Sequence, residues 1–255
     1  MREGGDQDVR PSDARVRPIL LASDLHLSSA RPQIAEAFVG FLEHTAAESQ
    51  ALYLLGDLFD LWVGDDDPDP LNLAVLDALG RLTARNVPVY LMHGNRDFLF
   101  GEAGARRAGV RLVDDPTRVR FFGTQTLLMH GDTLCTDDAE YLEQRARYRR
   151  PWVLRGFLAL PRFLRVGVGQ YFRRKSERAK RVTPREIMDV NPQAVADTLR
   201  ANGYPRLIHG HTHRPARHEH VVDGRVCERW VLGDWYSHGS YLRVMPAGIE
   251  SVLLP

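Results

Sequence analysis

Residues 51–57 read ALYLLGD, a short apolar run that ends in glycine and aspartate. A similar unit lies on either side of it, PILLASD at 18–24 and VPVYLMHGN at 87–95. Between these runs, residues 32–48 and 70–85 have the apolar spacing typical of helices. Short apolar runs that alternate with helices indicate an α/β layer with largely parallel strand pairing. The sequence therefore predicts an α/β fold.

The second half of the chain is richer in strand-like runs. RVRFFG (118–123) and TQTLLMHGD (124–132) predict a hairpin that turns at Gly123, and a helix is expected over 137–148. After RLIHGH, which begins at Arg206, come three further runs, HEHVV, RVCERWVLGDW and SYLRVMP. The carboxyl-terminal part is therefore expected to be mostly β-structure.

The composition excludes several classes of protein. The chain has 255 residues with 44% hydrophobic and 26% charged residues, as in an ordinary globular domain. A formal net charge of +1 argues against general nucleic-acid binding. Cys135 and Cys227 form no CxxC motif, which fits a reducing compartment. Residues 1–17 are polar and predict a flexible tail without a signal peptide, and no run of about 18 apolar residues predicts a membrane span.

Side chains that ligate metals follow the apolar runs, at the points where the strands are expected to end. Open α/β sheets place ligand sites at the carboxyl ends of their strands. The seven candidate metal ligands are Asp24, His26, Asp57, Asn95, His130, His211 and His213. Seven nitrogen and oxygen donors without thiolate suit two divalent cations such as Mn²⁺, Fe²⁺ or Zn²⁺ that share a bridging carboxylate. Taken alone, the GHTH stretch would also fit a polar loop of solvated histidines.

Two cations about 4 Å apart activate water and neutralise the oxygens of a phosphoryl group during in-line attack. The candidate ligands therefore favour hydrolysis of a phosphoester or a phosphoanhydride. The order of the motifs, D-x-H (24–26), GD (56–57), GN (94–95), HGD (130–132) and GHTH (210–213), resembles the calcineurin-like metallophosphoesterases from Ile19 onward.

The resemblance to this family implies a fold and a set of ligands. The implied fold is a β-sandwich flanked by helices, in four layers αββα, with a helical insertion or cap. The implied ligands of one metal are Asp24, His26 and His213. Asn95, His130 and His211 would hold the other metal, and Asp57 would bridge the two.

Arg96 departs from the family pattern. Most members have GNH, in which the histidine can protonate the leaving group, but this chain reads Gly94-Asn95-Arg96-Asp97. An arginine does not lose its proton at ordinary pH, although it can stabilise negative charge. A phosphate that leaves from an anhydride needs no proton, so Arg96 favours a pyrophosphate substrate. Arg96 and Asp57 are the expected catalytic residues.

A longer set of motifs narrows the resemblance to the UDP-2,3-diacylglucosamine hydrolases of lipid A synthesis. The motifs are LASDLHLSSARP, LGDLFDLWVGDD, HGNRDFL, MHGDTLCTDDAEYL, IMDVNP, LIHGHTHRP and VLGDWYSHGSYLRV. This resemblance implies two Mn²⁺ per chain and water attack on the α-phosphorus of UDP-2,3-diacylglucosamine, releasing UMP and 2,3-diacylglucosamine 1-phosphate. It also implies a peripheral position on the cytoplasmic face of the inner membrane. The implied substrate contacts are Asn95, Arg96, Asp138, Tyr141, Ser176, Lys180, Thr183 and His211, with the roles of Lys180 and Thr183 left open.

The segment 149–183 is rich in arginine and large apolar residues. It fits either an ordinary pair of surface helices or a cap whose apolar side chains receive acyl chains while its arginines meet anionic groups. The candidates for acyl contact are Trp152, Phe157, Leu158, Phe163 and Phe172. The expected organisation is a tail (1–17), a metallophosphoesterase core (18–148 and 184–255) and this helical insertion within the same domain.

Further aspartates lie close in sequence to the candidate ligands. Asp60, Asp97 and Asp132 are expected to orient ligands or to cap local turns rather than to bind metal. The acidic run 65–67 is expected to be a solvated loop. One alternative function is another dimetal pyrophosphatase or phosphodiesterase acting on a nucleotide conjugate. A catalytically inactive binding scaffold is less favoured because all seven ligand positions are filled. No nucleic acid and no obligate protein partner are expected.

Overall fold

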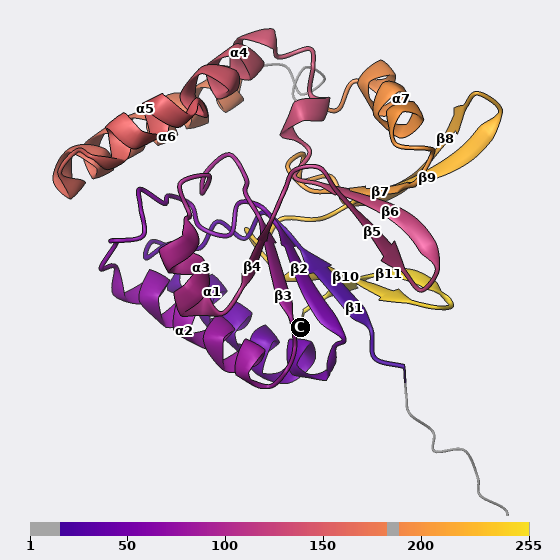
Figure 1. Ribbon diagram of the computed structural model, residues 1–255, viewed down its shortest axis with the longest axis horizontal. Coiled ribbons are helices and arrows are strands. Elements are labelled where there is room, and N and C mark those ends of the chain that lie inside the picture. Colours follow the sequence, from indigo (N-terminus) through magenta and orange to yellow (C-terminus); the bar gives the residue numbers. More distant parts are fainter. Residues whose placement is uncertain (1–15, 183–188, 255) are drawn as a thin grey trace, which may run out of the picture.

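Two β-sheets face each other in this computed structural model, which describes residues 16–182 and 189–254 (Figure 1). The first sheet has the strand order β11-β10-β1-β2-β3-β4, and the second has the order β5-β6-β7-β9-β8. The first sheet comprises β1 (Ile19–Ala22), β2 (Ala51–Leu55), β3 (Val89–Met92), β4 (Arg111–Val113), β10 (Ser240–Met245) and β11 (Gly248–Leu253). The second comprises β5 (Thr117–Phe121), β6 (Thr124–Met129), β7 (Arg206–His209), β8 (Ala216–Val222) and β9 (Arg225–Val231).

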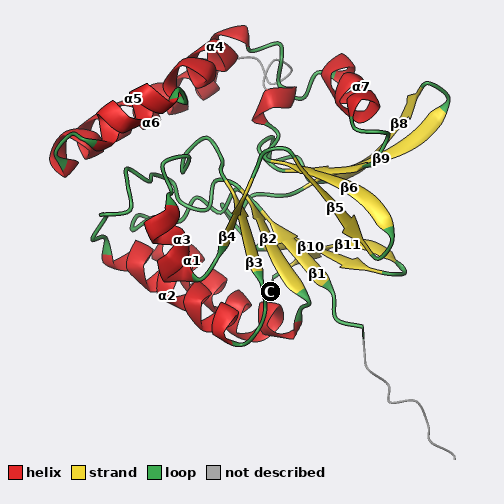
Figure 2. Cartoon of the chain, viewed as in Figure 1, coloured by secondary structure: helices red, strands yellow, loops and turns green. Residues whose placement is uncertain are grey.

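Helices lie on the outer faces of both sheets and extend beyond them (Figure 2). They are α1 (Pro32–Gly40), α2 (Pro70–Ala84), α3 (Glu102–Ala108), α4 (Ala139–Tyr148), α5 (Pro151–Leu158), α6 (Arg162–Val182) and α7 (Pro192–Ala201). A π-helical turn (Phe41–Thr45) and a 3₁₀ turn (Ala46–Glu48) follow α1, and another 3₁₀ turn spans Asp132–Leu134. Helices α4, α5 and α6 form an arm that projects from the sheets (Figure 1). We call these three helices the helical arm.

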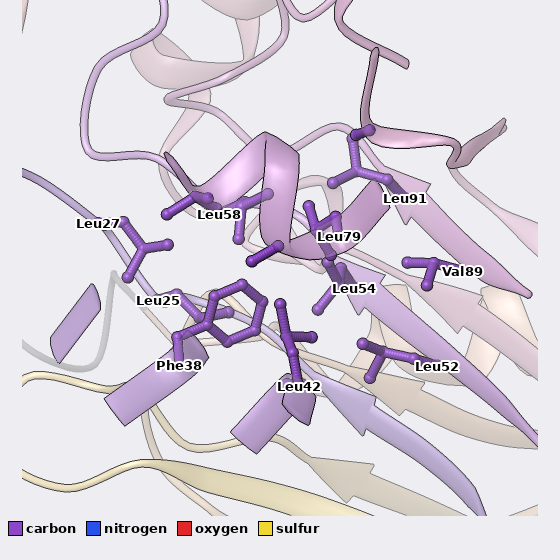
Figure 3. Close-up of a cluster of buried hydrophobic side chains, with 14 of the residues drawn as sticks. Leu25, Leu27, Phe38, Leu42, Leu52, Leu54, Leu58, Leu79, Val89 and Leu91 are labelled. Atoms are coloured by element: carbon purple, nitrogen blue, oxygen red, sulfur yellow. The ribbon is translucent and has the colours of Figure 1, made fainter. Parts of the chain in front are cut away.

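The buried side chains divide into three clusters that separate four layers. One cluster packs α1, α2 and α3 against the first sheet, with Leu52 and Leu54 facing Phe38 and Leu79 (Figure 3). The second fills the space between the sheets and consists of Ile19, Leu21, Ala51, Tyr53, Leu55, Met92, Phe121, Leu128, Ile208, Leu232, Leu242 and Val244. The third packs Val195 and Leu199 of α7 against the second sheet. This αββα arrangement confirms the predicted fold.

Strand direction brings the ends of the central strands together. β1, β2, β3 and β4 pair in parallel, as do β6, β7 and β9. The carboxyl ends of parallel strands lie at one edge of their sheet, and the loops that leave these ends therefore meet.

Most of the predicted elements are present, with some differences at their ends. The helix expected over 32–48 ends its α-helical part at Gly40 and continues as the π and 3₁₀ turns. The helix expected over 70–85 and the hairpin at Gly123 agree with α2 and with β5–β6. Elements α3, β4, α7 and β11 were not predicted as separate units. Thr183 and most of the predicted tail lie outside the described residues.

Candidate active site

The seven candidate metal ligands lie on the loops that follow five neighbouring strands. Asp24 and His26 follow β1, Asp57 follows β2 and Asn95 follows β3, all from the first sheet. His130 follows β6, while His211 and His213 follow β7, both from the second sheet. The structure thus brings ligands from both sheets to one edge of the sandwich.

The backbone of these loops is held in an uncommon conformation. Positive φ angles occur at Asp24 (55°), His26 (48°), Asp57 (55°), His211 (67°) and His213 (55°). Side chains other than glycine adopt the left-handed region only where the surrounding structure enforces it, and such residues cluster at functional sites. Backbone hydrogen bonds tie the loops together, from Asp24 N to Gly56 O at 3.1 Å and from His26 N to Asp57 O at 2.9 Å.

The side chains form two clusters that share Asp24. One consists of Asp24, His26 and His213, and the other of Asp24, Asp57 and His130; within each cluster the candidate ligand atoms lie within 4.8 Å of one another. His213 Nε2 is 3.3 Å from Asp24 Oδ1. Two ligands about 2.1 Å from a common ion lie roughly 3 to 3.5 Å apart, so this separation matches a pair of ligands on one ion.

Asp57 belongs to the second cluster and also faces His26 of the first. Its Oδ2 is 3.7 Å from His26 Nε2, and its Oδ1 is 3.9 Å from His130 Nε2. One carboxylate that faces a histidine from each sheet with different oxygens has the arrangement of a bridging ligand. His211 lies beside His130, with the ring centroids 5.1 Å apart.

Asn95 and Arg96 also meet Asp57. The backbone N–H of Arg96 donates to Asp57 Oδ1 at 2.8 Å. The carboxamide of Asn95 faces the same carboxylate, and in one of its two orientations the amide nitrogen donates to Asp57 Oδ1 at 2.9 Å. In the other orientation the amide oxygen faces the carboxylate, as a cation between the two groups would require. Gly94 permits this approach, because a Cβ at that position would collide with Asp57.

The electrostatics of the centre favour cations. Burial raises the pKa of Asp57 to about 6, with His130 opposing the rise. Burial alone would lower the pKa of His130, but Asp57, Asp132 and Asp24 raise it to about 9. At Asp24, burial favours a higher pKa, yet the surrounding histidines, His213 first, hold the pKa of this carboxyl well below its usual range. The buried carboxylates therefore stabilise positive charge, which either protons or metal ions can supply.

The donor set fits divalent metal ions. His130 Nε2 is buried and has no hydrogen-bond partner within residues 16–182 and 189–254. Its Nδ1 is 2.9 Å from the carbonyl of Leu55, which leaves Nε2 to face the centre. Imidazole, carboxylate and carboxamide donors with a carbonyl behind one imidazole are typical of metal centres with ordered ligands.

The expected substrate contacts lie between the centre and the helical arm. Asp138 precedes α4 and accepts a hydrogen bond from Tyr141 N at 3.0 Å. The ring of Tyr141 lies 6.3 Å from that of His211, and its hydroxyl donates to Asp132 at 2.7 Å. Ser176 lies on α6, 3.5 Å from Arg96 Nη2. The side chain of Lys180 and the whole of Thr183 lie outside the described residues.

A pocket of about 240 Å³ lies between the arm and the loops that follow β2 and β3 of the first sheet. Polar residues such as Asn95, Arg96, Tyr141 and Ser176 contribute to its lining. Much of the rest is apolar: Leu61, Trp62, Val63, Phe98, Leu99, Val153, Leu154, Phe157, Val168 and Phe172. Of the five candidates for acyl contact, Phe157 and Phe172 line the pocket, whereas Trp152, Leu158 and Phe163 are exposed and are absent from its lining.

Ion pairs join the arm to the core at three places among the described residues, and at one of them Arg173 Nη1 of α6 lies 3.2 Å from Asp60 Oδ2. Arg165, only 4% exposed, pairs with Asp66 and donates to the carbonyl of Val63 at 2.6 Å, while Arg162 pairs with Asp67 at 2.8 Å. At the third place, Arg145 of α4 donates to the buried Asp132 at 2.6 Å. The expectation of a solvated acidic loop at 65–67 is therefore wrong, because arginines of α6 bind two of its carboxylates.

Several residues beside the centre had no role in the sequence-based hypothesis. Arg145 and Arg149 lie four and eight residues after Tyr141, a spacing that places them on one face of α4 and could have marked them. Arg149 donates to the carbonyl of Gly94 at 2.6 Å. Asp234 and Tyr236 belong to the VLGDWYSHG stretch, and they approach His213 and His26.

Comparisons with known proteins agree with this geometry. The calcineurin-like phosphoesterase family matches residues 17–215. A UDP-2,3-diacylglucosamine hydrolase of Aromatoleum aromaticum is 52% identical over 230 residues, covering 90% of this chain and 94% of that protein. One of Klebsiella pneumoniae subsp. pneumoniae is 46% identical over 236 residues, covering 92% and 98%. The chain therefore belongs to the calcineurin-like phosphoesterase family and, within it, to the group of the UDP-2,3-diacylglucosamine hydrolases.

Proposed function

We propose that this protein hydrolyses the pyrophosphate bond of UDP-2,3-diacylglucosamine, a step of lipid A synthesis. Water attacks the α-phosphorus, and the products are UMP and 2,3-diacylglucosamine 1-phosphate. The observation that carries the proposal is the position of Asp57, a buried carboxylate that faces a histidine from each sheet. Asn95 and Arg96, which contact Asp57, also line the largely apolar pocket. A dimetal centre beside an apolar pocket suits a phosphoanhydride that carries acyl chains.

The seven ligands are proposed to hold two Mn²⁺ ions. Asp24, His26 and His213 would hold one, and Asn95, His130 and His211 the other, with Asp57 between them. When bound, the two cations activate the attacking water and neutralise the phosphoryl oxygens. The ordered loops of both sheets hold the ligands in place before the substrate arrives, which reduces reorganisation during the reaction.

Arg96 is proposed to stabilise charge on the phosphoryl groups. Its backbone is fixed by Asp57, and its guanidinium extends toward Ser176 of the arm. This position lies between the metal ligands and the pocket, where a pyrophosphate joined to an acylated sugar would pass. A guanidinium offers several donors in a planar fork that matches phosphate oxygens. Because the leaving phosphate needs no proton, a residue that cannot donate one suits an anhydride.

The helical arm is proposed to act as a lid that receives the acyl chains, with residues 149–183 as an insertion in the core domain. Phe157 and Phe172 of the arm face Trp62 and Leu99 of the core across the pocket. Burial of a methylene group in such a setting is worth about 0.8 kcal/mol, so two chains could supply much of the binding energy. Asp138, Tyr141, Ser176 and His211 remain proposed polar contacts of the substrate.

The outer surface of the arm is proposed to rest on the cytoplasmic face of the inner membrane. Trp152, Phe163 and Tyr171 are 68%, 72% and 64% exposed. Arginines of the same helices, such as Arg155 and Arg174, are exposed and suit anionic head groups. None of the described helices is both long enough and apolar enough to cross a membrane. Flotation with vesicles that contain anionic lipid tests the proposal, and a Trp152→Ser, Phe163→Ser double variant should float less.

The decisive experiment measures UMP release by metal-free protein before and after addition of Mn²⁺. UDP-2,3-diacylglucosamine is compared with a UDP-sugar that has no acyl chain. Mn²⁺-dependent cleavage of the acylated substrate alone supports the whole proposal. Equal cleavage of both would favour the alternative, a pyrophosphatase of other nucleotide conjugates. No cleavage of either would favour a binding scaffold.

A further inference from the structure

The loop between β9 and β10 sends three consecutive side chains in alternating directions. Trp235 points into the core, where it is fully buried and packs edge-on against Phe38 and Phe41. Its indole N–H donates to the carbonyl of Ser240 at 2.9 Å. Asp234 and Tyr236, on either side of this anchor, point the opposite way, to the cluster of Asp24, His26 and His213.

Asp234 holds His213 through the ring nitrogen that faces away from the cluster. Asp234 Oδ2 lies 3.3 Å from His213 Nδ1, while Nε2 of the same ring faces Asp24. The other oxygen, Oδ1, accepts the backbone N–H of Tyr236 at 2.9 Å. A carboxylate at Nδ1 favours the tautomer whose proton is on Nδ1, which leaves the lone pair of Nε2 for a metal ion.

Tyr236 covers the other histidine of the cluster. Its ring is stacked on that of His26 at an interplanar angle of 8° and a centroid distance of 5.2 Å. The guanidinium of Arg31 lies 4.4 Å above the tyrosine ring and donates to the backbone carbonyl of His26 at 2.9 Å. His26 is therefore restrained at its ring by Tyr236 and at its backbone by Arg31. A cation–π contact of this kind also fixes the tyrosine ring itself.

We propose that Asp234 and Tyr236 are positioning residues for the two histidines that hold one of the metal ions. Asp234 sets the tautomer of His213, Tyr236 sets the ring orientation of His26, and Trp235 fixes both to the core. The inference rests on the dimetal centre of the proposed function. It assigns a role to the GDWY stretch, which neither supplies a metal ligand nor lines the pocket.

Asp234→Asn tests the role of the carboxylate. Asparagine has one acceptor oxygen where aspartate has two, so it can keep the Tyr236 N–H or the His213 Nδ1–H, but not both. If it keeps the former, its NH₂ group faces Nδ1 and favours the tautomer with a proton on Nε2. Calorimetric titration of the metal-free protein with Mn²⁺, in the absence of substrate, should then show that one of the two ions binds about 10- to 100-fold more weakly than in the wild type.

Three further variants complete the test. Glu250→Gln, on an exposed ion pair of β11, is the matched control and should bind both ions as the wild type does. Tyr236 is 47% exposed, so its replacement spares the core. Tyr236→Phe keeps the stacked ring and should bind both ions with wild-type affinity, whereas Tyr236→Leu should bind one of the two ions more weakly. Thermal melting of the metal-free proteins should give the same Tm for all variants.

The possible outcomes separate this inference from the proposed function. If Asp234→Asn binds two ions with wild-type affinity, the inference is overturned and the proposed function stays intact. The same holds if Tyr236→Phe binds Mn²⁺ as weakly as Tyr236→Leu does. A large drop in Tm of the metal-free Asp234→Asn protein would show a structural role and would also overturn it. Wild-type protein that takes up no Mn²⁺ would overturn both.

Discussion

Asp57 illustrates how a single residue can define the centre. It is 2% exposed and meets a histidine from each sheet, the backbone N–H of Arg96 and the carboxamide of Asn95. Asp57→Asn keeps the shape but removes the charge. We expect kcat for UMP release to fall by about three orders of magnitude, equivalent to about 4 kcal/mol of transition-state stabilisation. Asp77→Asn, on the exposed face of α2, is the control, and unchanged hydrolysis by Asp57→Asn would contradict a bridging role.

Replacement of Arg96 should slow the reaction, because this arginine is proposed to stabilise charge on the phosphoryl groups. Arg96→Met removes the guanidinium that we propose to face the reacting phosphates, and we expect kcat to fall by about 10²- to 10³-fold. Arg96→Lys keeps the charge without the planar fork and should recover only part of the loss. Because the residue acts at phosphorus, the loss should be the same with acylated and non-acylated substrates. Arg106→Met, exposed on α3, serves as the control; a loss confined to the acylated substrate would place Arg96 on the lipid instead.

At the scale of elements, α4 is docked to the core by charge. Asp132 is completely buried and accepts hydrogen bonds from Tyr141 and Arg145, while Arg145 also lies 3.5 Å from Asp115. His130, His211 and Arg145 outweigh the effect of burial and hold the pKa of Asp132 well below its usual range. The carboxylate of Asp132 therefore stays ionised. Its negative charge is stabilised by Arg145 of α4 and by the candidate metal ligands His130 and His211.

Arg145→Met should destabilise the protein because it leaves a buried carboxylate without its closest cation. Loss of one partner from a buried pair costs about 3 to 5 kcal/mol. Urea unfolding of the metal-free proteins, monitored by circular dichroism, measures the difference in the free energy of unfolding between the wild type and Arg145→Met. Arg147→Met changes an exposed arginine of the same helix and should have little effect. Equal unfolding free energies for the two variants would mean that the Asp132 carboxylate is compensated by other groups.

The sequence predicted the elements that carry the centre because each ligand directly follows an apolar run. Asp24, Asp57 and Asn95 are visible in this way, since parallel strands end at a common edge. The ion pairs of the arm were not predictable, because Asp66 and Arg165 are 99 residues apart in the chain and meet only through the path of α6. For the same reason the acidic loop was wrongly expected to be solvated. Asp234 and Tyr236 were within a recognised motif, but their partners depend on how β10 returns beside β1.

At the scale of the whole molecule, the centre joins the two sheets of the sandwich. The first sheet contributes Asp24, His26, Asp57 and Asn95, and the second contributes His130, His211 and His213. Between the sheets, the apolar cluster that includes Leu21, Leu55 and Leu128 holds them face to face. Ions that bind ligands from both sheets can only do so when the sandwich is assembled. Binding and folding of this protein are therefore expected to be linked.

Mn²⁺ should consequently raise the melting temperature of metal-free protein. An ion that binds only the folded chain, present at about 100 times its Kd, adds about 2.7 kcal/mol to the free energy of unfolding. For a chain of this size, such a gain corresponds to an increase in Tm of roughly 5 to 10 °C. Differential scanning calorimetry at several Mn²⁺ concentrations measures the effect. Asp57→Asn should show a smaller increase, because it removes the ligand that we propose to be shared by both sites. If Tm does not change in the wild type, the folded chain binds Mn²⁺ no better than the unfolded chain does, and the ligands of the two sheets do not form a site in advance of the metal.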